Sequence, residues 1–90
     1  MDVEQIIKEV LAEELGVPKH LIQSHAYFSH DLGVKGGDAD DLIGAVRKRL
    51  NKEFEIDMDE YFHPEAIIHF RKVTDITIAD LAKMISKQVE

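Results

Sequence analysis

The sequence predicts an all-α protein, an antiparallel bundle of helices with one long loop. Three observations favour this class: apolar residues recur at helical spacing in three separate segments, capping residues precede these segments, and no segment alternates apolar and polar residues for long enough to predict a strand. The 90 residues suffice for one small domain, 1–90, and leave no room for a second core. A multidomain enzyme is therefore excluded.

The first helix is predicted over residues 3–15. Asp2 and Gln5 have the spacing of a capping box, and apolar side chains follow at the i, i+3, i+4, i+7 and i+8 positions of an amphipathic helix. Gly16 supplies the left-handed conformation that ends a helix, and Pro18 cannot continue it.

Residues 17–37 show no sustained period and contain proline, serine and glycine, so they predict a long ordered loop. A loop of this length needs apolar anchors on the helical core. The expected anchors are Leu21, Ile22, Tyr27, Phe28, Leu32 and Val34.

The second helix is predicted over residues 39–54. Asp38 is its expected N-cap, with Asp41 at the third helical position. The apolar stripe of this helix is expected to consist of Leu42, Ile43, Val46, Leu50 and Phe54.

After the second helix, the sequence predicts short helical turns and then one final helix. A brief helical turn is predicted to end before Pro64, and residues 65–70 could add another turn. Thr77 and Asp80 form a second capping-box pattern in front of a final helix over residues 78–88.

The charge, the absence of cysteine and the lack of long apolar runs argue against several classes of function. Eighteen acidic and eleven basic side chains give a formal charge of −7, which argues against binding the phosphate backbone of nucleic acids. There is no cysteine, so disulfides, thiol nucleophiles and thiolate metal sites are excluded. The first residues lack the pattern of a signal peptide, and no apolar run is long enough to span a membrane. We expect a cytoplasmic protein with no nucleic-acid or membrane partner.

The order of helix, long loop, Asp31-Leu32-Gly33, helix, short helix and capped final helix resembles the acyl carrier proteins over nearly the whole chain. The resemblance implies a four-helix bundle with a long loop between helices 1 and 2. In that family a serine shortly after Asp-Leu-Gly carries the phosphopantetheine arm, and without gaps its position falls on Gly36. Neither Gly36 nor its neighbours Lys35 and Gly37 offers a hydroxyl for a phosphodiester, so no cofactor is expected.

A closer resemblance is to a small bacterial family of unknown function that looks like a divergent branch of the acyl carrier proteins. The matching residues are Gly37-Asp38-Ala39-Asp40-Asp41-Leu42, Tyr61-Phe62 with Pro64-Glu65, and Thr77-Ile78-Ala79-Asp80-Leu81. This resemblance implies a carrier-like fold and no established activity.

We therefore expect a non-enzymatic interaction module, monomeric, that binds a protein partner. Carriers meet their enzymes through acidic groups on the second helix. The expected docking residues are Lys35, Gly36, Gly37, Asp38, Asp40, Asp41, Arg47 and Arg49. The simpler explanation of the acidic residues is the helix dipole, which favours each of them by about 0.3–1 kcal/mol at an N-terminus. The basic residues suit a helix C-terminus for the same reason, and the glycines suit a hinge or turn.

Two other functions remain open. A working carrier could be modified at an unorthodox residue such as Ser29. A metal- or proton-responsive regulator could use the five histidines. His20, His25 and His30 do not share a helical face, however, and Glu65 with His69 lacks a third ligand, so no metal is expected.

No catalytic apparatus is visible in the sequence. Ser29, His30 and Asp31 are consecutive, and adjacency alone cannot orient a catalytic triad. The acidic run at residues 57–60 lacks the glycine and glutamate of a calcium loop.

Overall fold

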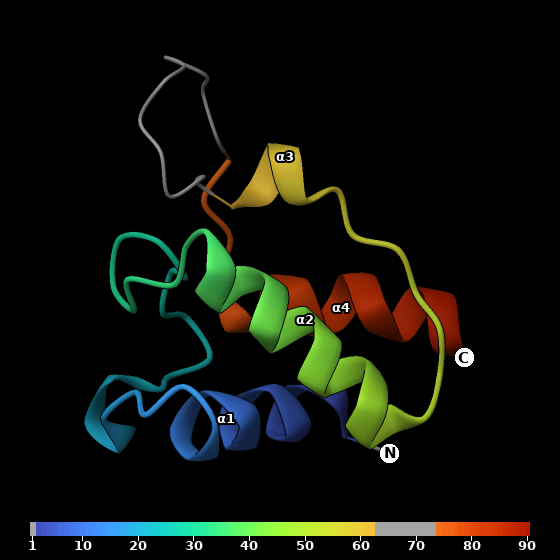
Figure 1. The fold of residues 1–90 in the computed structure, drawn as a ribbon, viewed down its shortest axis with the longest axis horizontal. Helices are drawn as coiled ribbons and strands as arrows, with labels where there is room; N and C mark the ends of the chain where they lie inside the picture. The colour runs from blue at the N-terminus through green and yellow to red at the C-terminus, as the bar shows by residue number, and fades with distance from the viewer. Residues whose placement is uncertain (1, 63–73) are drawn as a thin grey trace.

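The computed structural model describes residues 2–62 and 74–90, where helices are the only regular elements apart from one isolated β-bridge between Tyr27 and Thr77 (Figure 1). Three helices of more than ten residues form the core: α1 (Val3–Glu13), α2 (Gly37–Leu50) and α4 (Ile78–Val89). A 3₁₀ turn covers Lys19–Leu21, and α3 (Met58–Tyr61) is one turn of four residues. The predicted all-α class is confirmed, whereas a bundle of four helices is not.

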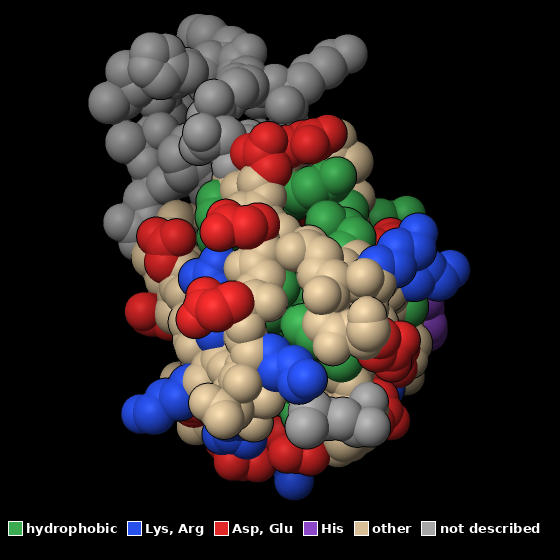
Figure 2. All heavy atoms as spheres, turned by 90° about the vertical axis from the view of Figure 1, so that its right-hand side faces the viewer, with side chains coloured by type: hydrophobic (Ala, Val, Ile, Leu, Met, Phe, Trp, Pro, Cys, Tyr) green, Lys and Arg blue, Asp and Glu red, His purple; other side chains and the backbone are tan. Residues whose placement is uncertain are grey.

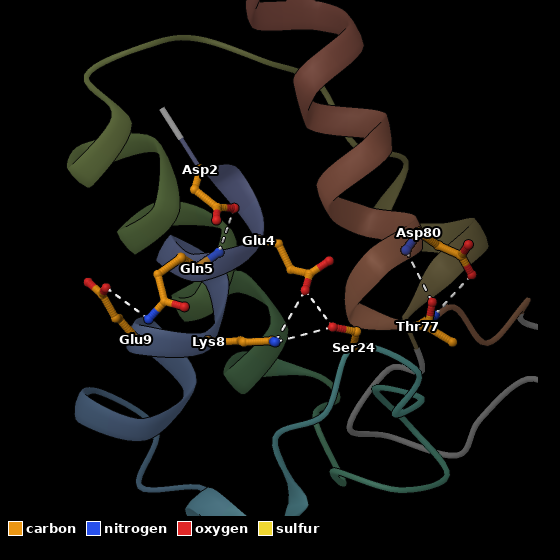
Figure 3. Close-up of polar contacts among 8 residues, drawn as sticks. All are labelled: Asp2, Glu4, Gln5, Lys8, Glu9, Ser24, Thr77 and Asp80. Carbon is orange, nitrogen blue, oxygen red and sulfur yellow. Dashed lines mark hydrogen bonds and ion pairs between the residues drawn. The ribbon is translucent and has the colours of Figure 1, made fainter.

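The first helix, α1, is two residues shorter than predicted. The Asp2 side chain accepts a hydrogen bond from the Gln5 backbone N–H, as predicted for the N-cap, but the Gln5 side chain turns to Glu9 instead of closing a capping box (Figure 3). The helix ends at Glu13 and Glu14 is its C-cap. Gly16 follows with a φ of 68°, the left-handed conformation that glycine adopts most readily.

The second helix, α2, is displaced toward the N-terminus relative to the prediction of 39–54. Gly36 is its N-cap, so the prediction that Asp38 caps this helix is wrong. Asn51 ends the helix in a left-handed conformation with a φ of 54°. Phe54 therefore lies beyond the helix, but its side chain is buried in the core as predicted.

The last helix, α4, confirms its prediction. The Thr77 hydroxyl accepts from the Asp80 backbone N–H at 3.1 Å, and the Asp80 carboxylate accepts from the Thr77 N–H at 3.2 Å (Figure 3). The brief turn expected before Pro64 is α3. The turn expected at 65–70 lies outside the described residues.

The core lies where α1 packs against both α2 and α4. Its largest fully buried side chains are Phe28, Ile7, Leu11, Leu42, Ile78, Leu81, Ile85, Val10 and Val46. Phe28 comes from the long loop and meets Phe62 edge to face, with ring centroids 5.6 Å apart. No helix among the described residues is long and apolar enough to cross a lipid bilayer.

The long loop is anchored by some of the predicted side chains and by backbone pairing. Phe28 and Val34 are buried, and Ile22 and Leu32 are partly buried against the core. Leu21 and Tyr27 are exposed, so the prediction is wrong for these two. The bonds that replace them are made by the backbone: the N–H groups of Phe28, Ile78 and Ala79 donate to the carbonyls of Ile76, Ala26 and Ser24, respectively. The loop is thereby tied to the start of α4.

Candidate docking surface

The junction between the long loop and α2 exposes most of the predicted docking residues. Lys35 and Gly37 are exposed, as are the three aspartates that follow, Asp38, Asp40 and Asp41. The Asp38 backbone N–H donates to the Lys35 carbonyl at 3.2 Å, and this bond fixes the turn into the helix. None of the three carboxylates makes a hydrogen bond or ion pair with another described residue. The surface of this junction is therefore acidic and open to solvent.

The backbone of Gly36 sets the direction in which α2 begins. Its φ of 57° and ψ of −128° lie in a region that L-residues with side chains avoid. Its carbonyl accepts from the N–H groups of Ala39 and Asp40, at 3.1 and 3.3 Å. Gly36 is therefore held in a conformation that favours glycine.

Arg47 is occupied within the fold. Its Nε and Nη2 donate to the Phe54 carbonyl at 3.2 and 2.9 Å, and the guanidinium lies 5.1 Å from the centre of the Phe54 ring. A cation above an aromatic face is attracted to it. Arg47 thus holds the segment after α2 against the helix, and a partner would find its guanidinium already engaged.

Arg49 joins α2 to α1. Its guanidinium lies 3.2 Å from the carboxylate of Glu13, 3.1 Å from that of Glu14 and 3.7 Å from that of Glu9. The hydrogen bond that Arg49 donates to the Glu13 carboxylate is the main cause that raises the pKa of Arg49. Arg47 and Arg49 are thus contacts of the fold, and the structure does not bring them to the junction at residues 35–41.

Sequence reasoning did not include Gly44, Lys48 or Lys52 among the expected docking residues. A surface hollow of about 370 Å³ is lined by Gly44, Arg47, Lys48, Asn51, Lys52 and Glu53. Lys48 and Lys52 form no ion pair with a described carboxylate. Figure 2 shows acidic and basic side chains interspersed on the face where α2 and α4 end. An exposed glycine inside a helix is the signal that could have drawn attention to this hollow.

Ser24 ties the long loop to α1 (Figure 3). Its hydroxyl donates to the carboxylate of Glu4 and accepts from the ammonium of Lys8 at 3.2 Å. Lys8 and Glu4 are also paired at 3.2 Å. The bond from Ser24, and after it the bond from Lys8, lowers the pKa of Glu4. This serine is engaged in holding the fold together.

Ser29, unlike Ser24, is held through its backbone and not through its hydroxyl. Its backbone N–H and that of His30 donate to the two oxygens of the Asp75 carboxylate, at 2.9 and 3.0 Å. Its hydroxyl makes no hydrogen bond with any described residue. The turn that carries this hydroxyl lies before Asp31-Leu32-Gly33 and not at the start of α2.

The histidines do not gather into a metal centre within residues 2–62 and 74–90. In this part of the chain, no group of three or more His, Cys, Asp or Glu side chains is placed to share a metal ion. His20, His25 and His30 lie exposed on the long loop. Glu65 and His69, which the sequence places four apart, lie outside the described residues.

Comparisons with known proteins give no family for this chain. No model of a known protein family matches the sequence, and no solved structure matches the fold.

Proposed function

We propose that this chain is a carrier-like interaction module without a phosphopantetheine arm, which binds a protein partner in the cytoplasm through the start of α2. The proposal includes a carrier-like bundle of helices. It includes no enzymatic step, because its action is docking.

The backbone of Gly36 is the observation that carries the proposal. A serine at this position would have to adopt a φ of 57° with a ψ of −128°, which costs an L-residue of order 1–3 kcal/mol. The local structure therefore favours a residue without a side chain at the place where a carrier attaches its arm.

The exposed carboxylates support the docking surface. Asp38, Asp40 and Asp41 are not used by the fold for capping or ion pairing within the described residues. Asp38 and Asp40 lie in the first turn of α2, where the helix dipole stabilises a negative charge by about 0.3–1 kcal/mol, and all three carboxylates are exposed to a basic partner surface. Arg47 and Arg49 act by holding α2 in place.

Affinity capture with matched charge reversals tests this surface. The tagged wild-type chain, Asp38→Lys and Glu60→Lys are compared, since both substitutions reverse one exposed carboxylate and Glu60 lies on α3. We expect Asp38→Lys to lose a protein that the other two chains retain, with at least a tenfold loss of affinity when that protein is purified. Equal capture by all three chains would contradict the docking surface.

The alternative is a carrier modified at Ser29. The Ser29 hydroxyl makes no hydrogen bond with a described residue and stands on a turn held by Asp75, and this observation favours the alternative. This alternative predicts a covalent gain in mass at Ser29 when the chain meets a phosphopantetheinyl transferase and coenzyme A.

A further inference from the structure

The exposed face of α2 carries opposite charges in a symmetric order about Gly44. Asp40 and Asp41 stand four and three residues before Gly44, and Arg47 and Lys48 stand three and four residues after it. The buried residues of the helix occupy the opposite side. Residues four apart lie one above another on a helix, so Asp40, Gly44 and Lys48 form one row on the surface.

Gly44 is a point where another backbone can come close. It is exposed, and a Cβ added there would meet nothing within 4 Å. The hollow beside it lies on the basic half of the face, and Lys48 lines it. A carboxylate that enters this hollow would meet a lysine that has no described acidic partner.

We propose that two copies of this chain associate through antiparallel α2 helices that cross at Gly44. Helices whose i±4 rows pack alongside each other cross at about 50°, the commonest class of helix packing. In a two-fold pair of this kind, the row of one copy runs beside the row of the other in the opposite direction. Asp40 then meets Lys48 of the second copy at two equivalent places.

A second copy fits this face because the pattern is complementary to itself. Rotation by a two-fold axis exchanges the acidic and basic halves, and a two-fold interface requires each patch to match itself in this way. This proposal rests on the proposed function, in which α2 is the docking surface. It proposes a weak dimer where the sequence analysis expected a monomer. The helix is about 21 Å long for its 14 residues, so the contact is smaller than the ~800 Å² per partner of a stable interface.

Charge exchange tests the pairing most sharply. The variants are Asp40→Lys, Lys48→Asp and the double variant Asp40→Lys/Lys48→Asp, which keeps the formal charge of −7. Sedimentation equilibrium is measured at about 0.15 M salt, where a Debye length of ~8 Å screens the repulsion between two acidic chains. We expect the wild type to dimerise with rising concentration and each single variant to bind itself at least tenfold more weakly. The double variant, and an equimolar mixture of the two single variants, should regain the dimer.

Two further variants show whether a loss of the dimer comes from the pairing itself, from unfolding or from the change in net charge. Gly44→Leu places a Cβ where nothing lies within 4 Å but blocks close approach of a second helix, so it should abolish the dimer while the helical circular dichroism is retained and the melting temperature does not fall. Lys83→Asp makes the same charge change as Lys48→Asp at an exposed site on α4 and should dimerise as the wild type does.

The outcomes distinguish this inference from the docking function. A wild-type chain that stays monomeric at millimolar concentration, or single variants that dimerise as well as the wild type, would overturn the pairing. Asp38 lies off the Asp40–Gly44–Lys48 row, so loss of a partner by Asp38→Lys still supports docking of another protein when the pairing fails.

Discussion

Gly36, the N-cap of α2, and Gly44, inside that helix, differ in backbone conformation. Gly36 is confined to a conformation that favours glycine, whereas Gly44 stands in ordinary helical geometry with open space around it. Substitution at these positions should therefore change the free energy of unfolding in opposite directions.

Gly36→Ser is expected to destabilise the protein by about 1–3 kcal/mol, because the serine would hold a positive φ at the N-cap. Chemical denaturation followed by circular dichroism measures this change. Gly37→Ser is the matched control, since Gly37 is the first helical residue and does not have a positive φ. Equal stability of the two variants would show that the conformation of Gly36 carries no strain for serine.

Gly44→Ala is expected to stabilise the monomer by about 0.5–1 kcal/mol, because alanine loses less backbone entropy in a helix and its Cβ meets no neighbour. The same denaturation experiment, carried out at low protein concentration, measures it. A destabilised Gly44→Ala chain would mean that the helix surface at this point is more crowded than the structure has it.

Among the structural elements, the long loop is bonded to α1 by the side chain of Ser24. Ser24→Ala removes the bond to the Glu4 carboxylate and should cost about 1 kcal/mol at neutral pH. The pKa of Glu4 is lowered in the folded state, so the stability that this group contributes is present above its ordinary pKa and is lost as the pH falls through the folded value.

The difference between wild type and Ser24→Ala should consequently shrink as the pH falls below about 4.3, the ordinary pKa of glutamate. Urea denaturation at a series of pH values measures it. Ser29→Ala serves as the control, because the Ser29 hydroxyl makes no bond with a described residue. A difference that stayed constant down to pH 2 would show that the Ser24 bond does not depend on an ionised Glu4.

The elements that the sequence predicted well are those whose signals are local. Thr77 and Asp80 carry the whole of a capping box within four residues, and the start of α4 was predicted correctly. The start of α2 was not, because Asp38 looks like a cap while the actual cap, Gly36, acts through its backbone. The end of α2 was also missed: Asn51 just past a last turn with three basic residues is a helix stop signal, but the apolar spacing that continues to Phe54 was followed instead.

For the candidate docking surface too, the features with local sequence signals were predicted and those that depend on folding were not. Exposed aspartates at the start of α2 were predicted from their sequence positions. The engagement of Arg47 by Phe54 and of Arg49 by glutamates of α1 was not, because both depend on residues brought together by folding. Leu21 and Tyr27 look like anchors by composition, yet the loop turns them outward and uses its backbone instead.

For the molecule as a whole, Phe28 joins the long loop to the segment after α3 through its contact with Phe62. Phe28→Ala should lower the stability of the entire domain by about 3–5 kcal/mol, a large fraction of the total for a chain of this size. Tyr27→Ala is the neighbouring control and should cost far less, because Tyr27 is 43% exposed. Thermal unfolding of both variants measures the difference, and similar losses would place the loop anchor elsewhere.

The claim on which the function depends is that the chain acts without a covalently attached arm. Intact-mass spectrometry of the wild type, after incubation with a phosphopantetheinyl transferase and coenzyme A, tests it most directly, with an ordinary acyl carrier protein as positive control and Ser29→Ala as the companion variant. The account predicts an unchanged mass for both chains. A gain of one phosphopantetheine on the wild type, absent from Ser29→Ala, would contradict it and identify a carrier.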